Sequence, residues 1–349
     1  MIYSNSAGKN NALPKQSIEV KSFPFSSSEK TSFTFIDLFA GIGGFRMAMQ
    51  SAGGRCVYSS EWDKAAKTTY FTNFGEMPLG DIMLQDVKDS IPAKFDVLCA
   101  GFPCQAFSIA GLQKGFSDSR GLLFFEIKKI IEKHRPKAVV LENVKNLVKH
   151  DKGRSFKTIL DILEGDLGYK VFYKVLNTMT HSNIPQNRER IFIVCFDPLQ
   201  VANHFRFKFP KKIPLTKTVA DFLETERQLE CYYYSAKSSI YTKLEKNVTR
   251  NTAVYQWRRT YVQENKNSVC PALTANMGTG GHNVPIIKDS YGIRKLTPRE
   301  CFALQGFPVD QFIFPEISKS SLYKQIGNSV TLGLVQKIAA ETAAILKSS

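Results

Sequence analysis

The chain has 349 residues, of which 43% are hydrophobic, 12% aromatic and 22% charged. This composition excludes a disordered, fibrous or small disulfide-stabilised protein and predicts a folded globular one. Lys and Arg number 47 against 31 Asp and Glu, a formal net charge of +16. Such an excess favours a polyanionic partner such as nucleic acid, although a basic metabolic enzyme is compatible with it.

The sequence predicts an intracellular protein with reduced thiols and no metal. No run approaches the roughly 18 consecutive apolar residues of a membrane span, and the first residues, MIYSNSAGKNNALPKQ, lack a signal peptide's apolar core. The seven cysteines include no Cys-x-x-Cys pair, so neither a zinc knuckle nor a disulfide framework is expected.

Residues 1–30 are rich in Ser, Lys and Asn without apolar periodicity, which predicts a mobile N-terminal arm. From Phe33 onward, short apolar runs alternate with helical patterns. This alternation predicts a doubly wound, Rossmann-like α/β domain, a parallel sheet with helices on both faces. The predicted strands are 33–39, 55–60, 95–101, 137–143, 169–176 and 190–196, and the predicted helices are 43–53, 63–74, 121–134 and 153–165.

The alternation stops after Pro198, and mixed polar, aromatic and basic residues predict a second, smaller domain over 199–291. Thr297-Pro298-Arg299-Glu300 then predicts a helix start, with Thr as N-cap, Pro at the first helical position and Glu at the third. A last helix over 331–346 is expected to pack on the first domain, which therefore comprises 31–198 and 292–349.

The first predicted strand ends in DLFAGIGG, where glycines let a ligand approach the backbone at a helix N-terminus. A plain structural turn explains this segment equally well. A dinucleotide fingerprint would need glycine at position 46, which is Arg46, so nicotinamide and flavin cofactors are disfavoured. Glu61 and Trp62 end the next strand and suit a ribose and an adenine, and Asp81 with Ile82 can close the adenine pocket.

Cys104 directly follows the strand 95–101, at the edge where open α/β sheets bind ligands. This position favours a nucleophile, whereas Cys56, Cys99 and Cys195 are more simply interpreted as small buried apolar side chains.

Glu142 ends the next strand and can face the same substrate as Cys104, unless it only caps the following helix. Arg188 and Arg190 point the same way if their segment is extended, and one of them can bind a substrate oxygen. A solvated charged segment is the alternative. Gln325–Val330 can bring amide and hydroxyl groups to a ligand, or simply cap the last helix.

Together these motifs resemble the C5-cytosine DNA methyltransferases that use S-adenosylmethionine. The resemblance covers 33–198 and 292–346 and rests on DLFAGIGG, EWD, GDI, GFPCQAFS, RGLLFF, LENV, QNRERIFIV, RKLTPRECFALQGFP and QIGNSV, in the family's order. It implies methylation of C5 of a flipped-out cytosine in a short double-stranded DNA sequence, as in prokaryotic restriction-modification systems. It also implies cofactor contacts from Phe39, Ile42, Gly43, Gly44, Glu61, Trp62, Asp81, Ile82, Leu123, Asn328 and Ser329, with Pro103 beside the donor.

The resemblance also implies catalytic roles. The Cys104 thiolate adds to cytosine C6, which makes C5 nucleophilic toward the sulfonium methyl. Protonated Glu142 binds N3, and Arg190 holds O2 with Arg188 in support. Because C6 is shielded in the duplex, the base must flip out, and the loop 102–120, with Gln105 and Ser108, is expected to fill the gap.

The segment 199–291 is expected to select the DNA sequence, since Arg and Gln pair with guanine and adenine edges. A hairpin turn explains its glycines almost as well. The DNA contacts predicted there are Arg258, Arg259, Thr274, Asn276 and Gly278.

Two other functions are compatible with parts of the sequence. A non-catalytic DNA-binding protein would not need Cys104, Glu142 and Arg190 together. A tRNA cytosine methyltransferase shares the motifs, but the length of 199–291 favours DNA. We expect a monomer in the bacterial cytoplasm, at the nucleoid, with a cognate restriction endonuclease that shares the site without being bound, and no membrane.

Overall fold

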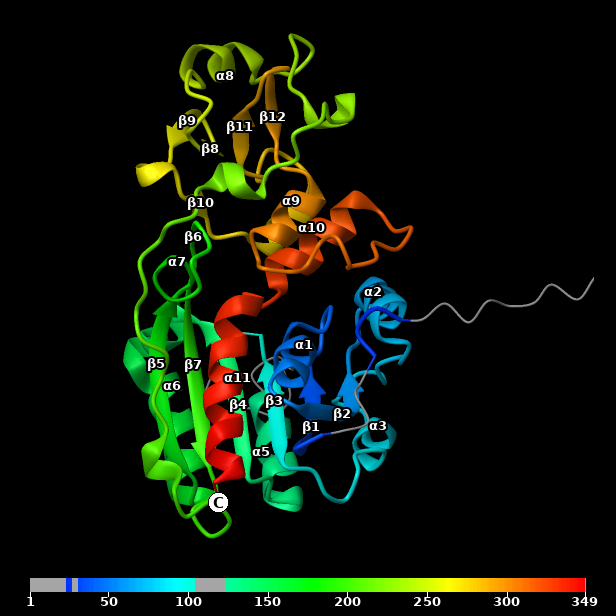
Figure 1. The fold of residues 1–349 in the computed structure, drawn as a ribbon, viewed down its shortest axis with the longest axis vertical. Helices are drawn as coiled ribbons and strands as arrows, with labels where there is room; N and C mark the ends of the chain where they lie inside the picture. Colours follow the sequence, from blue (N-terminus) through cyan, green and yellow to red (C-terminus); the bar gives the residue numbers. More distant parts are fainter. Residues whose placement is uncertain (1–22, 27–30, 104–122, 349) are drawn as a thin grey trace, which may run out of the picture.

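The computed structural model describes residues 23–26, 31–103 and 123–348. Its larger domain is built on a six-stranded sheet of order β2-β1-β3-β4-β7-β5 (Figure 1). Each of the six predicted strands is confirmed to within two residues at either end. They are β1 (Phe33–Leu38), β2 (Gly54–Ser60), β3 (Val97–Gly101), β4 (Ala138–Val144), β5 (Lys170–Asn177) and β7 (Glu189–Phe196).

The expectation of a wholly parallel sheet is wrong for β7, which pairs antiparallel with both β4 and β5. Only residues 178–188 join β5 to β7, and they hold the short α7 (Thr178–His181) and β6 (Gln186–Asn187). A parallel return needs a crossover of about a dozen residues or more, usually a helix, so this link returns the chain as an antiparallel neighbour.

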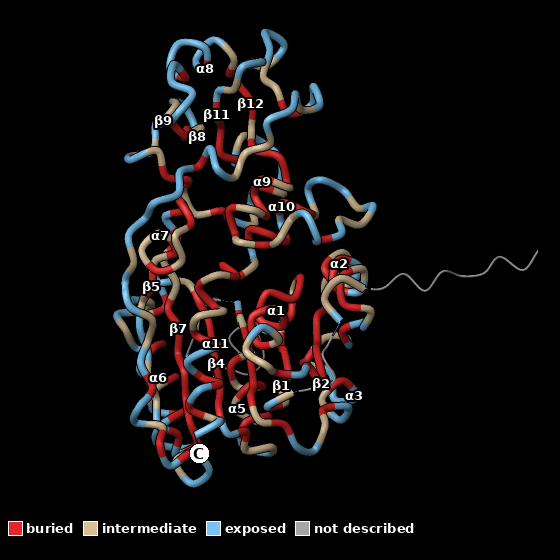
Figure 2. The backbone as a smooth tube through the Cα atoms, in the orientation of Figure 1, coloured by how far each residue is buried: buried red, intermediate tan, exposed pale blue. Residues whose placement is uncertain are grey.

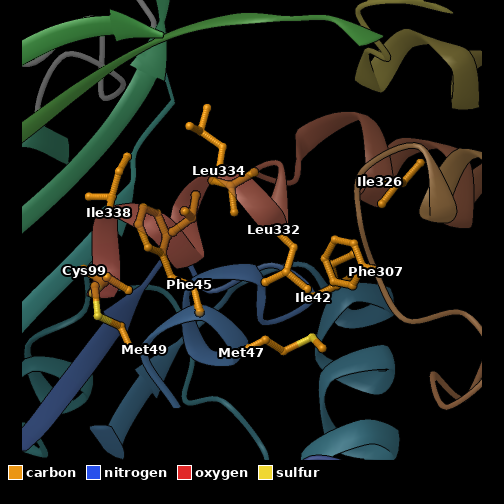
Figure 3. Packing of buried hydrophobic residues seen from close by; sticks show 14 of the residues in the cluster. Ile42, Phe45, Met47, Met49, Cys99, Phe307, Ile326, Leu332, Leu334 and Ile338 are labelled. Carbon is orange, nitrogen blue, oxygen red and sulfur yellow. The ribbon is translucent and has the colours of Figure 1, made fainter. Parts of the chain in front are cut away.

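Helices cover both faces of the sheet, as predicted. On one face α1 (Gly44–Ser51), α2 (Lys64–Phe74) and α11 (Leu332–Lys347) share an apolar core. Figure 3 shows Ile42, Phe45 and Met47 facing Leu332 and Ile338 in this core. On the other face α3 (Gln85–Asp89), α5 (Leu123–His134) and α6 (Arg154–Leu160), which continues as a π-helical turn to Asp166, form a second core. The inner strands β1, β3, β4 and β7 are buried on both sides (Figure 2), as expected for a sheet between two helix layers, whereas most of the edge strand β5 is at least partly exposed.

A second domain lies beyond the edge of the sheet at which β1 ends (Figure 1). Its sheet has the order β12-β11-β8-β9, and α8 (Tyr241–Asn247) packs on one face. The strands are β8 (Tyr255–Arg258), β9 (Tyr261–Glu264), β11 (Ile286–Lys288) and β12 (Ile293–Lys295), and β10 (Cys270–Pro271) pairs with β6.

The bounds of this domain differ from the predicted 199–291. Val201 and Phe207 are buried in the core of the large domain, so the segment first runs along that domain. At the other end, β12 completes the small sheet after residue 291.

The predicted capping box at Thr297 is confirmed at the start of α9 (Pro298–Ala303). The backbone N–H of Thr297 donates to Glu300 Oε2 over 2.8 Å, and Thr297 Oγ1 accepts from the backbone N–H of Glu300 over 3.2 Å. Glu300 also pairs with Arg294 of β12, with N–O separations of 2.7 and 2.8 Å, and both side chains are fully buried. This pair attaches the small sheet to α9.

Within the described residues, one helical stretch, Lys319–Lys347, is long and apolar enough to cross a membrane. It consists of α10 (Lys319–Asn328) and α11, which are separate helices joined through Ser329–Thr331. More than half of its most apolar window is buried inside the protein, which identifies the stretch as core helices.

Residues 23–26 correct the expectation of a mobile arm over 1–30. The backbone N–H of Phe25 donates to the carbonyl of Asn73 over 3.1 Å, and its ring packs against Phe74 and Phe312. The other residues of the predicted arm lie outside the described part of the chain.

Candidate active site

The ends of β1 to β4 bring the predicted site residues to one edge of the sheet. Leu38 of β1 lies opposite Ser60 of β2 and Ala100 of β3, and Gly101 lies opposite Glu142 of β4. The residues that follow these strands are therefore neighbours, although they come from four separate parts of the sequence.

The three glycines of the turn after β1 have different surroundings. A side chain on Gly43 would lie 2.2 Å from the Phe74 ring, and one on Gly44 would lie 2.7 Å from Val330 Cγ2. No side chain fits at these two glycines, because Phe74 and Val330 pack against them. At Gly41 (φ +56°) the nearest atom is a carbonyl oxygen 3.9 Å away, so Gly41 is where a ligand can reach the backbone.

Glu61 holds this turn in place. Its Oε2 accepts from the backbone N–H of Gly41 and its Oε1 from that of Asp63, both over 2.8 Å. Burial raises the pKa of Glu61, while the hydrogen bonds from Asp63 and Gly41 oppose this. The carboxyl group is thus fixed beside the open space at Gly41.

Trp62 and the segment after Gly80 flank Glu61. The Trp62 side chain is 75% exposed, which is unusual for an indole and leaves its face free for stacking. Ile82 is buried, and Asp81 Oδ1 accepts from the backbone N–H of Met83 over 3.0 Å. Predicted neighbours Phe39 (φ +56°) and Leu123 are partly buried, and Ile42 is buried in the core.

Glu142 and Arg190 form an ion pair at the ends of β4 and β7, with Glu142 Oε1 3.0 Å from Arg190 Nε. Glu142 is 8% exposed. Burial raises its pKa, and the positive charges of Arg190 and Arg188 partly offset the rise. The structure therefore places a buried carboxyl group with a raised pKa beside a guanidinium group.

Arg188 lies near Arg190 but has different partners. Its guanidinium donates to the backbone carbonyls of Leu273, of Gly327 (3.1 Å) and of Ser329 (2.7 Å), and burial lowers its pKa. Through these bonds Arg188 connects the start of β7 with the second domain and with the link between α10 and α11. It therefore supports the active site from behind.

Asn143 fixes the chain next to the predicted nucleophile. Its Nδ2 donates to the carbonyl of Phe102 over 2.9 Å, and its Oδ1 accepts from the backbone N–H of Val144 over 2.8 Å. Pro103 is exposed after this anchor. Cys104, Gln105 and Ser108, with the rest of the loop up to residue 122, lie outside the described residues. By contrast Cys56, Cys99 and Cys195 are buried, as predicted.

The QIGNSV segment ends a helix, which corrects the alternative that it caps the last one. Gln325 to Asn328 form the end of α10, and Asn328 is exposed. Ser329 Oγ would lie 3.2 Å from a side chain on Gly44. The segment therefore closes over the turn after β1.

The predicted DNA contacts in the second domain fall into two groups. Gly278, in the 3₁₀ helix Ala275–Thr279, packs on α10, where an added side chain would lie 2.2 Å from the carbonyl of Ser320. Thr274 hydrogen-bonds to Asn276 beside it. Arg258 and Arg259 are exposed on the β8–β9 hairpin.

Residues 33–344 match the family model of the C-5 cytosine-specific DNA methylases. The chain belongs to this family. It is a DNA (cytosine-5-)-methyltransferase that uses S-adenosylmethionine as methyl donor.

Curated relatives and solved structures agree with this assignment. The type II methyltransferase M.Bsp6I of Bacillus sp. (strain RFL6) is 48% identical over 86% of this chain and 96% of its own length. M.HpaII of Haemophilus parainfluenzae is 45% identical over 88% of both chains. M.HhaI of Haemophilus parahaemolyticus is 42% identical over 92% and 96%. The crystal structure of S. pombe Dnmt2 methyltransferase has a TM-score of 0.68 at 19% identity over 91% and 99%, which shows a shared fold.

The residues present fit the methyl donor. The open space at Gly41, the fixed carboxyl group of Glu61 and the exposed indole of Trp62 offer a backbone approach, a hydroxyl acceptor and a stacking face. No cluster of metal-ligating side chains occurs in the described ranges. A pocket of about 390 Å³ beside Phe25 and α11 contains none of the predicted site residues.

Sequence reasoning missed the buried polar residues that support the site. Gln186 Nε2 donates to Gln305 Oε1 over 2.8 Å, and Gln305 Nε2 donates to the carbonyl of Ser329 over 3.0 Å. Both glutamines lie inside recognised motifs, QNRER and LQGFP. A motif alone does not distinguish a glutamine that binds substrate from one that binds the backbone. Gly41 was not among the predicted cofactor contacts, because the sequence alone does not distinguish it from Gly43 and Gly44. Only the packing around each glycine does.

Proposed function

We propose that Cys104, Glu142 and Arg190 methylate a cytosine flipped out of double-stranded DNA. The Glu142–Arg190 ion pair at the edge of the sheet supports this proposal most directly. A buried carboxyl group beside a guanidinium group offers a proton donor for N3 and a cationic donor for O2 of the same pyrimidine ring.

Each step follows from the chemistry of the ring. The Cys104 thiolate adds to C6 while Glu142 donates a hydrogen bond to N3, so the electron pair pushed into the ring makes C5 nucleophilic. S-adenosylmethionine would supply the methyl group to C5 as an electrophilic sulfonium substituent, and its sulfur would leave with the bonding electron pair as a neutral thioether. Loss of the C5 proton to a base and departure of the thiolate then restore the aromatic ring and free Cys104.

The surroundings of Glu142 favour its protonated form more than those of an exposed glutamate do. Burial raises its pKa, and Arg190 and Arg188 limit the rise. A carboxyl group poised in this way can both donate to N3 and stabilise the charge that develops on the ring.

Base flipping is part of the proposal because C6 lies inside the stacked duplex. We assign the filling of the vacated space to the loop 102–120, of which residues 104–120, including Gln105 and Ser108, lie outside the described residues. In this proposal the segment 199–291, which holds most of the second domain, selects the sequence, and Arg188 and α10 hold that domain against the catalytic domain.

The biological setting proposed is a restriction-modification system of a bacterial cell. The chain would act as a monomer in the cytoplasm, at the nucleoid, and protect the sites that a separate endonuclease cuts. Identities of 42 to 48% with type II methyltransferases support this setting.

The test is methylation of plasmid DNA and of bulk tRNA with the purified protein, each followed by bisulfite sequencing. We expect one short sequence to be methylated throughout the plasmid and no tRNA position to react. Methylation of tRNA alone would contradict the proposal, as would DNA methylation without sequence preference.

Exchange of residues 199–291 for the segment of a relative with a different known site tests the role of the second domain. The chimera should methylate the relative's site. A folded and active chimera that keeps the original site would show that specificity resides elsewhere.

A further inference from the structure

The small sheet has one face that packs on the rest of the protein. Ile287 and Arg294 lie opposite each other on β11 and β12. Ile287 belongs to the core shared with the large domain, and Arg294 pairs with Glu300 of α9. The other face carries Tyr255 and Ile286, which are buried under α8.

Strand pairing extends the first face onto the β8–β9 hairpin. Directly opposite residues share a face and successive residues alternate. Because Tyr255 pairs with Ile286 on the α8 side, Gln256 and Arg258 lie on the other face, and Gln263 joins them opposite Gln256. The face that α9 covers at β12 therefore continues on the hairpin as a polar surface on which Arg258 and Gln263 are exposed.

The two glutamines fix the guanidinium group of Arg258. Arg258 Nε donates to Gln263 Oε1 over 3.1 Å, and Arg258 Nη2 donates to Gln256 Oε1 over 2.9 Å. Their amide oxygens set the plane of the guanidinium group without neutralising its charge. Arg250, on the same domain, is instead paired with the carboxylate of Glu264 over 2.8 Å.

We propose that Arg258 reads a guanine of the target sequence in the major groove. Of its five N–H groups, the ones at the outer edge, on Nη1 and Nη2, form a planar fork that matches O6 and N7 of guanine. The two glutamines hold this fork in one plane, which preorganises it for a planar bidentate partner such as the guanine edge. A phosphate can accept the same fork, and the lysine variant below separates the two contacts. The inference rests on the proposed function, since it takes the second domain as the part that reads DNA.

The experiment begins with the target found by bisulfite sequencing. Each of its guanines is then replaced singly by 7-deazaguanine, which lacks N7, and kcat/KM for methylation is measured. For the wild-type protein we expect one guanine at which the replacement lowers kcat/KM about 5- to 150-fold. Arg258→Ala should lose sensitivity at that guanine alone. Arg250→Ala removes the same charge from the same domain and should keep the wild-type pattern.

Arg258→Lys separates a base contact from a phosphate contact, because it keeps the charge and removes the fork. We expect it to lose the discrimination at that guanine while keeping the salt dependence of DNA binding. If Arg258→Ala instead weakens binding to all substrates equally and lowers the salt slope by about 1, Arg258 contacts a phosphate and the inference is wrong. A target without guanine, or an unchanged pattern in Arg258→Ala, also overturns it.

The exchange of residues 199–291 distinguishes a failure of the proposed role of the second domain from a failure of the assignment of Arg258. If the exchange does not transfer the methylated site, the proposed role of the second domain fails. If it does, and Arg258→Ala keeps the wild-type pattern, only the assignment of Arg258 fails.

Discussion

Arg190 and Glu142 meet across the antiparallel strand pair β4–β7, with Nε and Oε1 3.0 Å apart. Arg190 lies opposite Val144, two residues beyond Glu142 along β4. Because β7 runs against β4, the start of β7 lies at the edge where β4 ends. The reversed strand therefore delivers the arginine near its start to the site, whereas a parallel strand in this position would place its first residues at the opposite edge of the sheet.

Cys104→Ser should abolish methyl transfer and leave DNA binding largely intact, because a hydroxyl group is a far weaker nucleophile than a thiolate at neutral pH. Incorporation of tritiated methyl groups measures the first effect and fluorescence anisotropy the second. Cys231→Ser is the matched control, since Cys231 is an exposed free thiol. Near wild-type incorporation by Cys104→Ser would remove Cys104 from the mechanism.

Glu142→Gln should lower the single-turnover rate by about 10²- to 10⁴-fold, the usual contribution of a positioned acid or base. It should also change the pH profile. Burial raises the pKa of Glu142, so the protonated form persists to higher pH than for an exposed glutamate and is lost as the pH rises through the raised pKa. The wild-type rate should fall on that alkaline side, and the glutamine variant should lack this fall. An identical alkaline limb in both proteins would show that another group titrates.

Gly44→Ala should weaken binding of S-adenosylmethionine, because the new Cβ would lie 2.7 Å from Val330 Cγ2 and must displace the α10–α11 link. Overpacking of this kind costs about 1–3 kcal/mol of folding stability. Isothermal titration calorimetry gives the affinity and urea denaturation the stability. Gly165→Ala is the control, as no atom lies within 4 Å of its added Cβ. Equal stabilities of the two variants would contradict the packing role of Gly44, and equal affinities would contradict its effect on binding of the methyl donor.

Glu300→Ala should destabilise the protein by about 3–5 kcal/mol, because it leaves the fully buried Arg294 without its main partner. Glu264→Ala removes a partner from a surface pair and should cost about 0–1 kcal/mol. Urea denaturation of both variants checks the contrast. Similar losses in the two would mean that Asp289, also bonded to Arg294, suffices to hold the guanidinium group.

Much of the fold could be predicted because the apolar runs in the sequence coincide with the buried strands of the sheet. The capping box at Thr297 and Glu300 depends on neighbouring residues only, and the structure confirms it in full. The direction of β7 could not be predicted from its own residues. An apolar run such as RIFIVCF is compatible with either direction, and the length of the link before it decides.

The sequence by itself determined the family, the methyl donor and the order of the site motifs along the chain, because these depend on residue types at short spacings. Only the tertiary structure decided which of these residues meet. It separated Arg190, paired with Glu142, from Arg188, which binds the backbone carbonyls of Leu273, Gly327 and Ser329. It also distinguished Gly41, open to a ligand, from Gly44, filled by Val330. The physical reason is that a side chain's role depends on partners far away in sequence, which strand pairing and helix packing bring within hydrogen-bond or van der Waals distance.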